Sequence, residues 1–200
     1  MLSRIELTEY LSTHLKLSEF KDYAPNGLQV EGKLDIRCIR TAVTASLEVI
    51  QAAIQDNADA LLVHHGYFWK GELPEVVGMK KQRLSALLRH DMNLFAYHLP
   101  LDCHLDIGNN ICLARRLKLS DVASHSAQGV PNLVWTGKLL KVQTPERFDF
   151  NHCCWAPAPP LPRRSLWQLG VGQATQAADA HRCALPQVLS EKDYKKMQFR

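Results

Sequence analysis

Apolar positions along the first 140 residues alternate between helical spacing and short continuous runs. A helical stripe that follows the capping-box pair Ser3 and Glu6 predicts a first helix over about residues 3–16. Short apolar runs bounded by turn-forming residues predict buried strands. We expect strands at about residues 36–44, 60–65 and 93–98, and further helices from Ser46 to about Asn57, over about residues 80–90 and over about residues 108–117.

The order of these elements predicts the fold class. Strands that alternate with helices of this length form βαβ units, so we expect an α/β fold around a mainly parallel sheet. Because such crossovers are right-handed, the three strands should end on one edge of the sheet. Seven of the ten prolines lie in residues 131–200, and from about residue 140 neither period continues, apart from a possible helix at Gln173–Ala180. We therefore expect an irregular C-terminal extension, with an α/β domain over residues 1–140 and a divergent, poorly ordered tail over residues 141–200.

Histidines stand at the ends of two predicted strands. One apolar run ends in His64 and His65, and the next predicted strand ends in His98, which Asp102 and His104 follow. Ligands of α/β proteins bind at this edge of the sheet, and neutral imidazole is the commonest transition-metal ligand. The sequence therefore predicts a metal site, with His64, His65 and Asp102 as ligands and His98 and His104 as weaker candidates.

The neighbouring pair His64 and His65 bears on the number of ions. Adjacent histidines leave a regular strand in different directions, so one ion would not readily bind both. Two ions that share a carboxylate would accommodate the pair, and Asp102 offers two oxygens for that bridge. Mixed imidazole and carboxylate ligation suits zinc, manganese, iron, cobalt or nickel, and the sequence does not distinguish among them. Two simpler interpretations stay open: the histidines are ordinary hydrogen-bonded residues, or His98 and His104 only orient the ligands.

Other chemistries have less support in the sequence. The motifs of serine hydrolases, P-loop NTPases and dinucleotide-binding folds are absent from it. Cys103 has histidine neighbours, yet nothing distinguishes a nucleophile from a buried thiol. The aromatic run Tyr67–Trp69 is either a wall for a planar ligand or a part of the core.

The net charge of +4 is unevenly distributed. Residues 1–130 carry 14 Lys and Arg against 15 Asp and Glu, whereas residues 131–200 carry 10 against 5. The α/β part therefore shows no basic footprint for nucleic acid. The six cysteines have no zinc-ribbon spacing, and neither a signal peptide nor a membrane-spanning apolar stretch occurs. We expect a cytoplasmic protein without a membrane partner.

Five segments of the chain form a recognisable set: Pro25–Gly32, Thr41–Ser46, His64–Gly71, His98–His104 and Gly108–Asn110. With the stretch up to Gly137 they closely resemble the GTP cyclohydrolase 1 type 2 homologue family, also called NIF-three-like, over about residues 1–140. The resemblance implies an α/β fold with a dinuclear metal site, generally in a toroidal homohexamer. It also implies that His64, His65 and Asp102 are metal ligands, because they match the first three ligands of the family.

The end of the chain departs from the family pattern. Family members are longer and complete the site with a His and a Glu four residues apart on a late helix. The late histidines here are His152 and His181, and the residues four positions on are Ala156 and Leu185. We therefore expect the C-terminal part to be divergent, truncated or frame-shifted, and the metal site to be impaired if the late ligands are absent.

The function expected from these observations is that of a metal-binding, hydrolase-like protein. It would act on a nucleotide or another small polar substrate through two divalent ions per subunit; the cyclohydrolase activity follows from the family name alone, and no catalytic residue is assigned. The alternative is a non-catalytic, metal-binding oligomeric scaffold. A third interpretation is a defective product that folds marginally, because an unfinished sheet leaves an edge and an apolar face uncovered.

Overall fold

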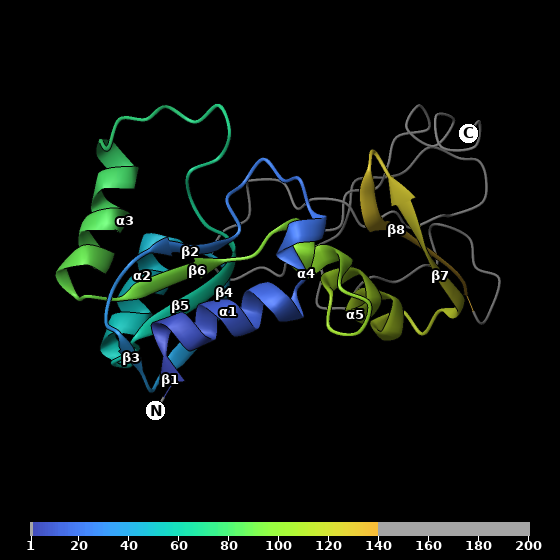
Figure 1. The fold of residues 1–200 in the computed structure, drawn as a ribbon, viewed down its shortest axis with the longest axis horizontal. Coiled ribbons are helices and arrows are strands. Elements are labelled where there is room, and N and C mark those ends of the chain that lie inside the picture. Colours follow the sequence, from blue (N-terminus) through green and yellow to red (C-terminus); the bar gives the residue numbers. More distant parts are fainter. Residues whose placement is uncertain (1, 140–200) are drawn as a thin grey trace. The chain divides into compact units, whose positions relative to one another are not determined.

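The computed structural model describes residues 2–139 (Figure 1). The chain divides into two compact units, of which the first ends at Leu101 and the second begins at Asp102. The predicted division at residue 140 falls at the limit of the described residues and stays a prediction, and the predicted C-terminal extension lies outside them. In the described part of the chain no helix is long and apolar enough to cross a membrane.

A four-stranded sheet lies at the centre of the first unit, with its strands in the order β2-β6-β5-β4. The strands are β2 (Gly27–Val30), β4 (Ile39–Thr44), β5 (Ala60–His65) and β6 (Asn93–Ala96). β5 runs parallel to both β4 and β6, and β2 pairs with β6 in the antiparallel direction. This arrangement confirms the predicted α/β class with a mainly parallel sheet, and it puts the carboxyl ends of three strands on one edge.

Helices cover both faces of this sheet (Figure 1). The side chains of β5 alternate between the faces, so Leu61 and Val63 pack with one set of helices and Ala60 with another. The first face carries α2 (Leu47–Gln55) and α3 (Gly78–Arg89), and the second carries α1 (Arg4–His14). The core on the first face includes Ile50 and Leu87, each 0% exposed, so burial of apolar side chains fixes both helices on the sheet.

The helix boundaries follow local signals that the sequence contains. The Ser3 hydroxyl accepts a hydrogen bond from the Glu6 N–H, and the Glu6 carboxylate accepts one from the Ser3 N–H, which confirms the predicted capping box. The Ser46 side chain caps α2 by accepting from the Val49 N–H. These caps satisfy backbone donors that no earlier helical turn can pair.

Several predicted elements differ from the observed ones. The strand expected over residues 36–44 is two strands, β3 (Asp35–Ile36) and β4, and β3 pairs with β1 (Leu2–Ser3). Residues 22–32 are rich in turn-forming residues and no strand is expected there, but they contain β2, whose pairing with β6 comes from tertiary contact rather than from local propensity. The third parallel strand ends at Ala96, and a short helix, α4 (Leu99–Cys103), follows it.

The second unit contains α5 (Asn109–Arg116) and a two-stranded hairpin of β7 (Ser120–Ala127) and β8 (Val130–Lys138). The helix is predicted by its spacing, whereas the hairpin is not, because β7 is mostly polar and only partly buried. Gln128 and Gly129 form its turn with positive φ angles of 54° and 77°, the conformation that tight hairpins require. Val134 and Trp135 of β8 are buried.

Candidate metal centre

Three histidines converge at the carboxyl edge of the parallel sheet. His64 and His65 end β5, and His98 follows β6; the pairing of Val63 with Ala96 brings these strand ends level. One ring nitrogen from each histidine lies within 4.8 Å of those of the other two. Nitrogens that bind one tetrahedral zinc ion lie roughly 3.4 Å apart, so small side-chain rotations bring this group to ligand spacing. His64 and His98 are buried, and His65 is partly exposed.

The backbone fixes the tautomer of His64. Its Nδ1 lies 3.0 Å from the carbonyl oxygen of Tyr97. Because a carbonyl oxygen only accepts hydrogen bonds, Nδ1 carries the hydrogen and donates it. The lone pair of His64 is therefore on Nε2, in the arrangement usual for a metal-binding histidine.

A buried carboxylate does the same for His98. The Nδ1 of His98 lies 3.1 Å from both carboxylate oxygens of Asp22, and the two side chains are 3% and 2% exposed. Burial raises the pKa of Asp22, but hydrogen bonds from His98 and two other donors outweigh this and lower the pKa to about 2. The backbone N–H of His98 donates to Asn26 Oδ1 over 2.7 Å. Asp22 thus holds the imidazole with its Nε2 available as a ligand atom.

His65 is kept neutral by its surroundings. Burial, together with the proximity of His64 and His98, lowers the pKa of His65 to about 4. Its Nδ1 lies 3.2 Å from the Thr44 hydroxyl of the neighbouring strand. An imidazole that is neutral at neutral pH can donate a lone pair to a metal without first losing a proton. The chemistry of the three side chains therefore fits a divalent transition metal.

Aromatic rings lie beside the histidines. The Trp69 ring is 5.0 Å from the His98 ring, edge to face, and 6.1 Å from the His65 ring. The Tyr23 ring is 5.4 Å from His98 and 5.9 Å from Trp69. Within the run Tyr67–Trp69, which the sequence offered as an aromatic wall, Trp69 alone faces the histidines, because Tyr67 is buried and donates to the Ala45 carbonyl oxygen over 2.5 Å.

A close backbone approach explains the glycine that follows the two histidines. A Cβ atom on Gly66 would lie 2.1 Å from Oε1 of Gln29 and 2.7 Å from Cβ of Ala96. The same Gln29 side chain accepts from the Tyr67 N–H over 2.7 Å and donates to the Tyr67 carbonyl oxygen over 3.0 Å. The Gln29 side chain of β2 therefore holds the backbone directly after His65, and this close contact leaves room only for glycine.

Asp102 and His104 belong to the second unit and are not members of the three-histidine group. Asp102 is buried, and its Oδ1 accepts a hydrogen bond of 2.9 Å from Asn109, the first residue of α5. The Nδ1 of His104 accepts from the backbone N–H groups of Asp106 and Ile107, each over 3.2 Å, within a local turn. The sequence-predicted assignment of Asp102 as a ligand stays a prediction.

The structure thus brings together three of the five sequence-predicted site residues: His64, His65 and His98. His98, a weaker candidate in the sequence, is a full member of the group. Asp22 was missed, since 76 residues separate it from His98 and no motif spacing links them. The one available signal was an acidic residue at the start of a turn-rich segment that contains an Asn-Gly step and a second glycine. Cys103 is 1% exposed, which agrees with a packed thiol rather than a nucleophile.

A parallel-sheet edge that carries three converging histidines defines the class: an α/β protein with a candidate metal centre. The chain belongs to the Duf34/NIF3 (NGG1p interacting factor 3) family, whose sequence profile matches residues 2–187. This confirms the resemblance noted in the sequence, and the match continues past residue 140.

Individual relatives agree with this assignment. A GTP cyclohydrolase 1 type 2 homolog of Yersinia pestis is 45% identical over 186 residues, which cover 89% of this chain and 74% of the relative. One of Haemophilus influenzae is 48% identical over 147 residues, which cover 74% of this chain and 58% of the relative.

Solved structures show the same fold. The protein ybgI, described as of unknown function, superimposes with a TM-score of 0.65 and is 45% identical in sequence. The match covers 70% of this chain and 55% of ybgI. TTHA1606 from Thermus thermophilus gives a TM-score of 0.60 and 43% identity, with 65% of this chain and 53% of that one covered. The chain thus spans about half the length of these two proteins.

Proposed function

We propose that the chain is a metal-dependent, hydrolase-like protein that acts on a nucleotide or a similar small polar substrate. The observation that carries the proposal is the convergence of His64, His65 and His98, two of which have Nδ1 engaged by a fixed acceptor. A divalent ion held there would supply a Lewis acid and would lower the pKa of a bound water toward neutrality.

The residues of the chain have separate roles in this proposal. His64, His65 and His98 hold the ion through neutral imidazoles, and Asp22 and the Tyr97 carbonyl group keep two of those rings in the binding tautomer. Burial of His64 and His98 excludes water behind the ligands, while the partly exposed His65 faces the accessible side.

The rim of the site supports the proposed substrate class. The rings of Trp69 and Tyr23 lie next to His98 and are themselves partly exposed, so a planar heterocycle could stack beside the metal ligands. The printed name of the relatives, GTP cyclohydrolase 1 type 2 homolog, supports a purine nucleotide. This part of the proposal concerns the activity of the whole protein, and the chain spans about half to three quarters of the length of these relatives.

Two finer features also belong to the proposal. Asp102 is a proposed further ligand, because its carboxylate could bridge a second ion. Assembly into a homo-oligomer, a hexamer by family resemblance, is proposed as well. The alternative is a non-catalytic metal-binding scaffold, and it is favoured by the late part of the chain, where neither His152 nor His181 is followed by a glutamate at the family spacing.

Metal titration with matched histidine variants tests the proposal. Metal-free protein is titrated with Zn²⁺ and with Co²⁺, whose visible absorption reports the ligand set. We expect His64→Ala and His98→Ala to weaken binding at least about 100-fold, since each removes a direct ligand. His90→Ala removes an exposed histidine at the end of α3 and should leave binding unchanged.

The outcomes separate the two functions. Hydrolysis of a purine nucleotide by the metal-loaded protein, lost in His64→Ala, supports the hydrolase. Stoichiometric metal binding without turnover on a nucleotide panel supports the scaffold. No metal bound to the parent protein at micromolar concentration would overturn both.

A further inference from the structure

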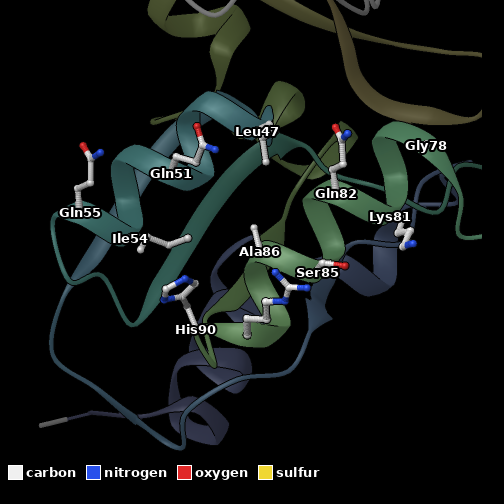
Figure 2. A pocket seen from close by; sticks show the side chains of 11 residues that line it. Leu47, Gln51, Ile54, Gln55, Gly78, Lys81, Gln82, Ser85, Ala86 and His90 are labelled. Carbon is white, nitrogen blue, oxygen red and sulfur yellow. The ribbon is translucent and has the colours of Figure 1, made fainter.

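Helices α2 and α3 form a groove between them. Figure 2 shows side chains from both helices that line it, and it encloses about 940 Å³. We call it the α2–α3 groove and define it by Leu47, Gln51 and Ile54 on α2 and by Lys81, Ala86 and Arg89 on α3. None of these residues belongs to the candidate metal centre, so the groove is a separate feature of the first unit.

The lining combines an apolar stripe with polar walls. Leu47, Ile54 and Ala86 are partly buried, whereas Gln51, Lys81 and Arg89 are exposed. Leu47 and Ile54 are seven residues apart on α2, which is two helical turns or about 10 Å. An apolar repeat of two turns is the spacing at which a third helix lays its own apolar side chains into a groove.

The charge of the groove has one sign. Lys81 and Arg89 project from α3, and the residues that line the groove include no aspartate or glutamate. In the part of the chain that the structure describes, neither cation takes part in an ion pair or hydrogen bond. Over its full length, Gly78–Arg89, α3 carries four Lys and Arg residues and no acid, and its N-cap Val77 offers no side-chain cap. The residues that line the groove therefore carry a net positive charge.

The positions of the two cations indicate the kind of partner. Lys81 and Arg89 are eight residues apart, which is about 12 Å along the helix. Carboxylates two turns apart on a helix match this separation, and the apolar stripe matches the apolar face of the same helix. The C-terminal part of this chain is not complementary, since residues 131–200 carry 10 Lys and Arg against 5 Asp and Glu.

We propose that the α2–α3 groove is an interaction surface for an acidic amphipathic helix of a partner protein. Leu47 and Ile54 receive the apolar face of that helix, and Lys81 and Arg89 pair with carboxylates that flank it. A second copy of this chain is a poorer match for its helix α1, because the two acids on that helix, Glu6 and Glu9, are three residues apart rather than two turns.

The test uses labelled helical peptides of about 20 residues as probes, with leucines at heptad spacing. One peptide carries flanking glutamates, a second carries glutamines in their place, and a third carries lysines. Fluorescence anisotropy with the full chain should show the glutamate peptide binding about tenfold more tightly than the glutamine peptide, with the difference shrinking at high salt.

Charge reversal in the groove provides the matched control. The double variant Lys81→Glu with Arg89→Glu should prefer the lysine peptide, whereas Arg116→Glu with Lys118→Glu makes the same charge change elsewhere and should keep the parent preference. All four residues are exposed, and thermal melts check that each variant is folded. Equal binding of the glutamate and glutamine peptides would overturn the proposal. So would a dimer of the parent chain that the groove variant abolishes, since a second copy would then be the occupant.

Discussion

Replacing Asp22 with asparagine keeps the volume of the side chain and removes its negative charge. In the folded protein the Asp22 carboxylate accepts from His98 Nδ1, from the Asn26 amide and from the Leu99 N–H. An asparagine has one acceptor oxygen. Its NH₂ group would take the place of the second carboxylate oxygen and would face a hydrogen-bond donor there. The variant therefore loses charge-assisted hydrogen bonds in a site that is 2% exposed.

The pKa of Asp22 gives the size of the effect. A folded-state pKa of about 2, against an ordinary value of 3.8, corresponds to about 2 kcal/mol of stability. Since the folded pKa is the lower one, this stability is fully present above pH 3.8 and is lost as the pH falls through about 2. The difference between parent and Asp22→Asn should thus be constant from pH 7 to about pH 4 and shrink below it.

Urea denaturation of the metal-free proteins measures this difference in stability. Metal titration measures a second expected effect of the substitution, a change in metal affinity. Because Asp22 orients a ligand of the candidate centre, we expect Asp22→Asn to weaken metal binding about 10- to 100-fold. Asp56→Asn removes an exposed carboxylate that pairs with Arg40 and should change stability by about 0.5 kcal/mol or less. If Asp22→Asn behaves like Asp56→Asn in both assays, the role assigned to Asp22 is wrong.

Three further substitutions test other parts of the fold by urea denaturation. Tyr97→Phe should stabilise the protein by about 1 kcal/mol, because no described residue lies within hydrogen-bond distance of the buried hydroxyl; a loss of stability would show that it has a partner. Gly66→Ala should destabilise the protein by roughly 1–3 kcal/mol and weaken metal binding, since its Cβ meets Gln29. Unchanged stability and unchanged metal affinity would contradict the close contact described at Gly66. Asn93→Ala removes three hydrogen bonds of a fully buried amide and should destabilise the protein by roughly 2–3 kcal/mol. A loss below about 0.5 kcal/mol would show that these hydrogen bonds do not stabilise the fold as assigned.

The parts of the fold that local sequence determines were predictable. The Ser3 and Ser46 caps mark helix starts through bonds within one turn, and the apolar run before His64 marks β5. Parallel strand order then follows from the crossover rule, which is why His98 could be expected near His64 and His65. The inference needed no knowledge of side-chain contacts.

The remaining features depend on contacts between distant residues. β2 has little strand propensity and exists because β6 offers it a pairing edge, and the hairpin strand β7 is polar because much of it is exposed. The bond between Asp22 and His98 joins a turn to a strand end, and no periodicity in the sequence encodes it. Sequence reasoning therefore found the candidate ligands more readily than the groups that orient them.

The two hydrogen-bond acceptors that orient His64 and His98 differ in whether a substitution can remove them. The partner of His64 is the main-chain carbonyl of Tyr97, which every amino acid at that position would retain. The partner of His98 is a side chain, so a single codon change at Asp22 can alter the basicity of that imidazole. The orientation of one candidate ligand is thus insensitive to substitution of its partner, while the orientation of the other changes with a single substitution that leaves all three histidines in place.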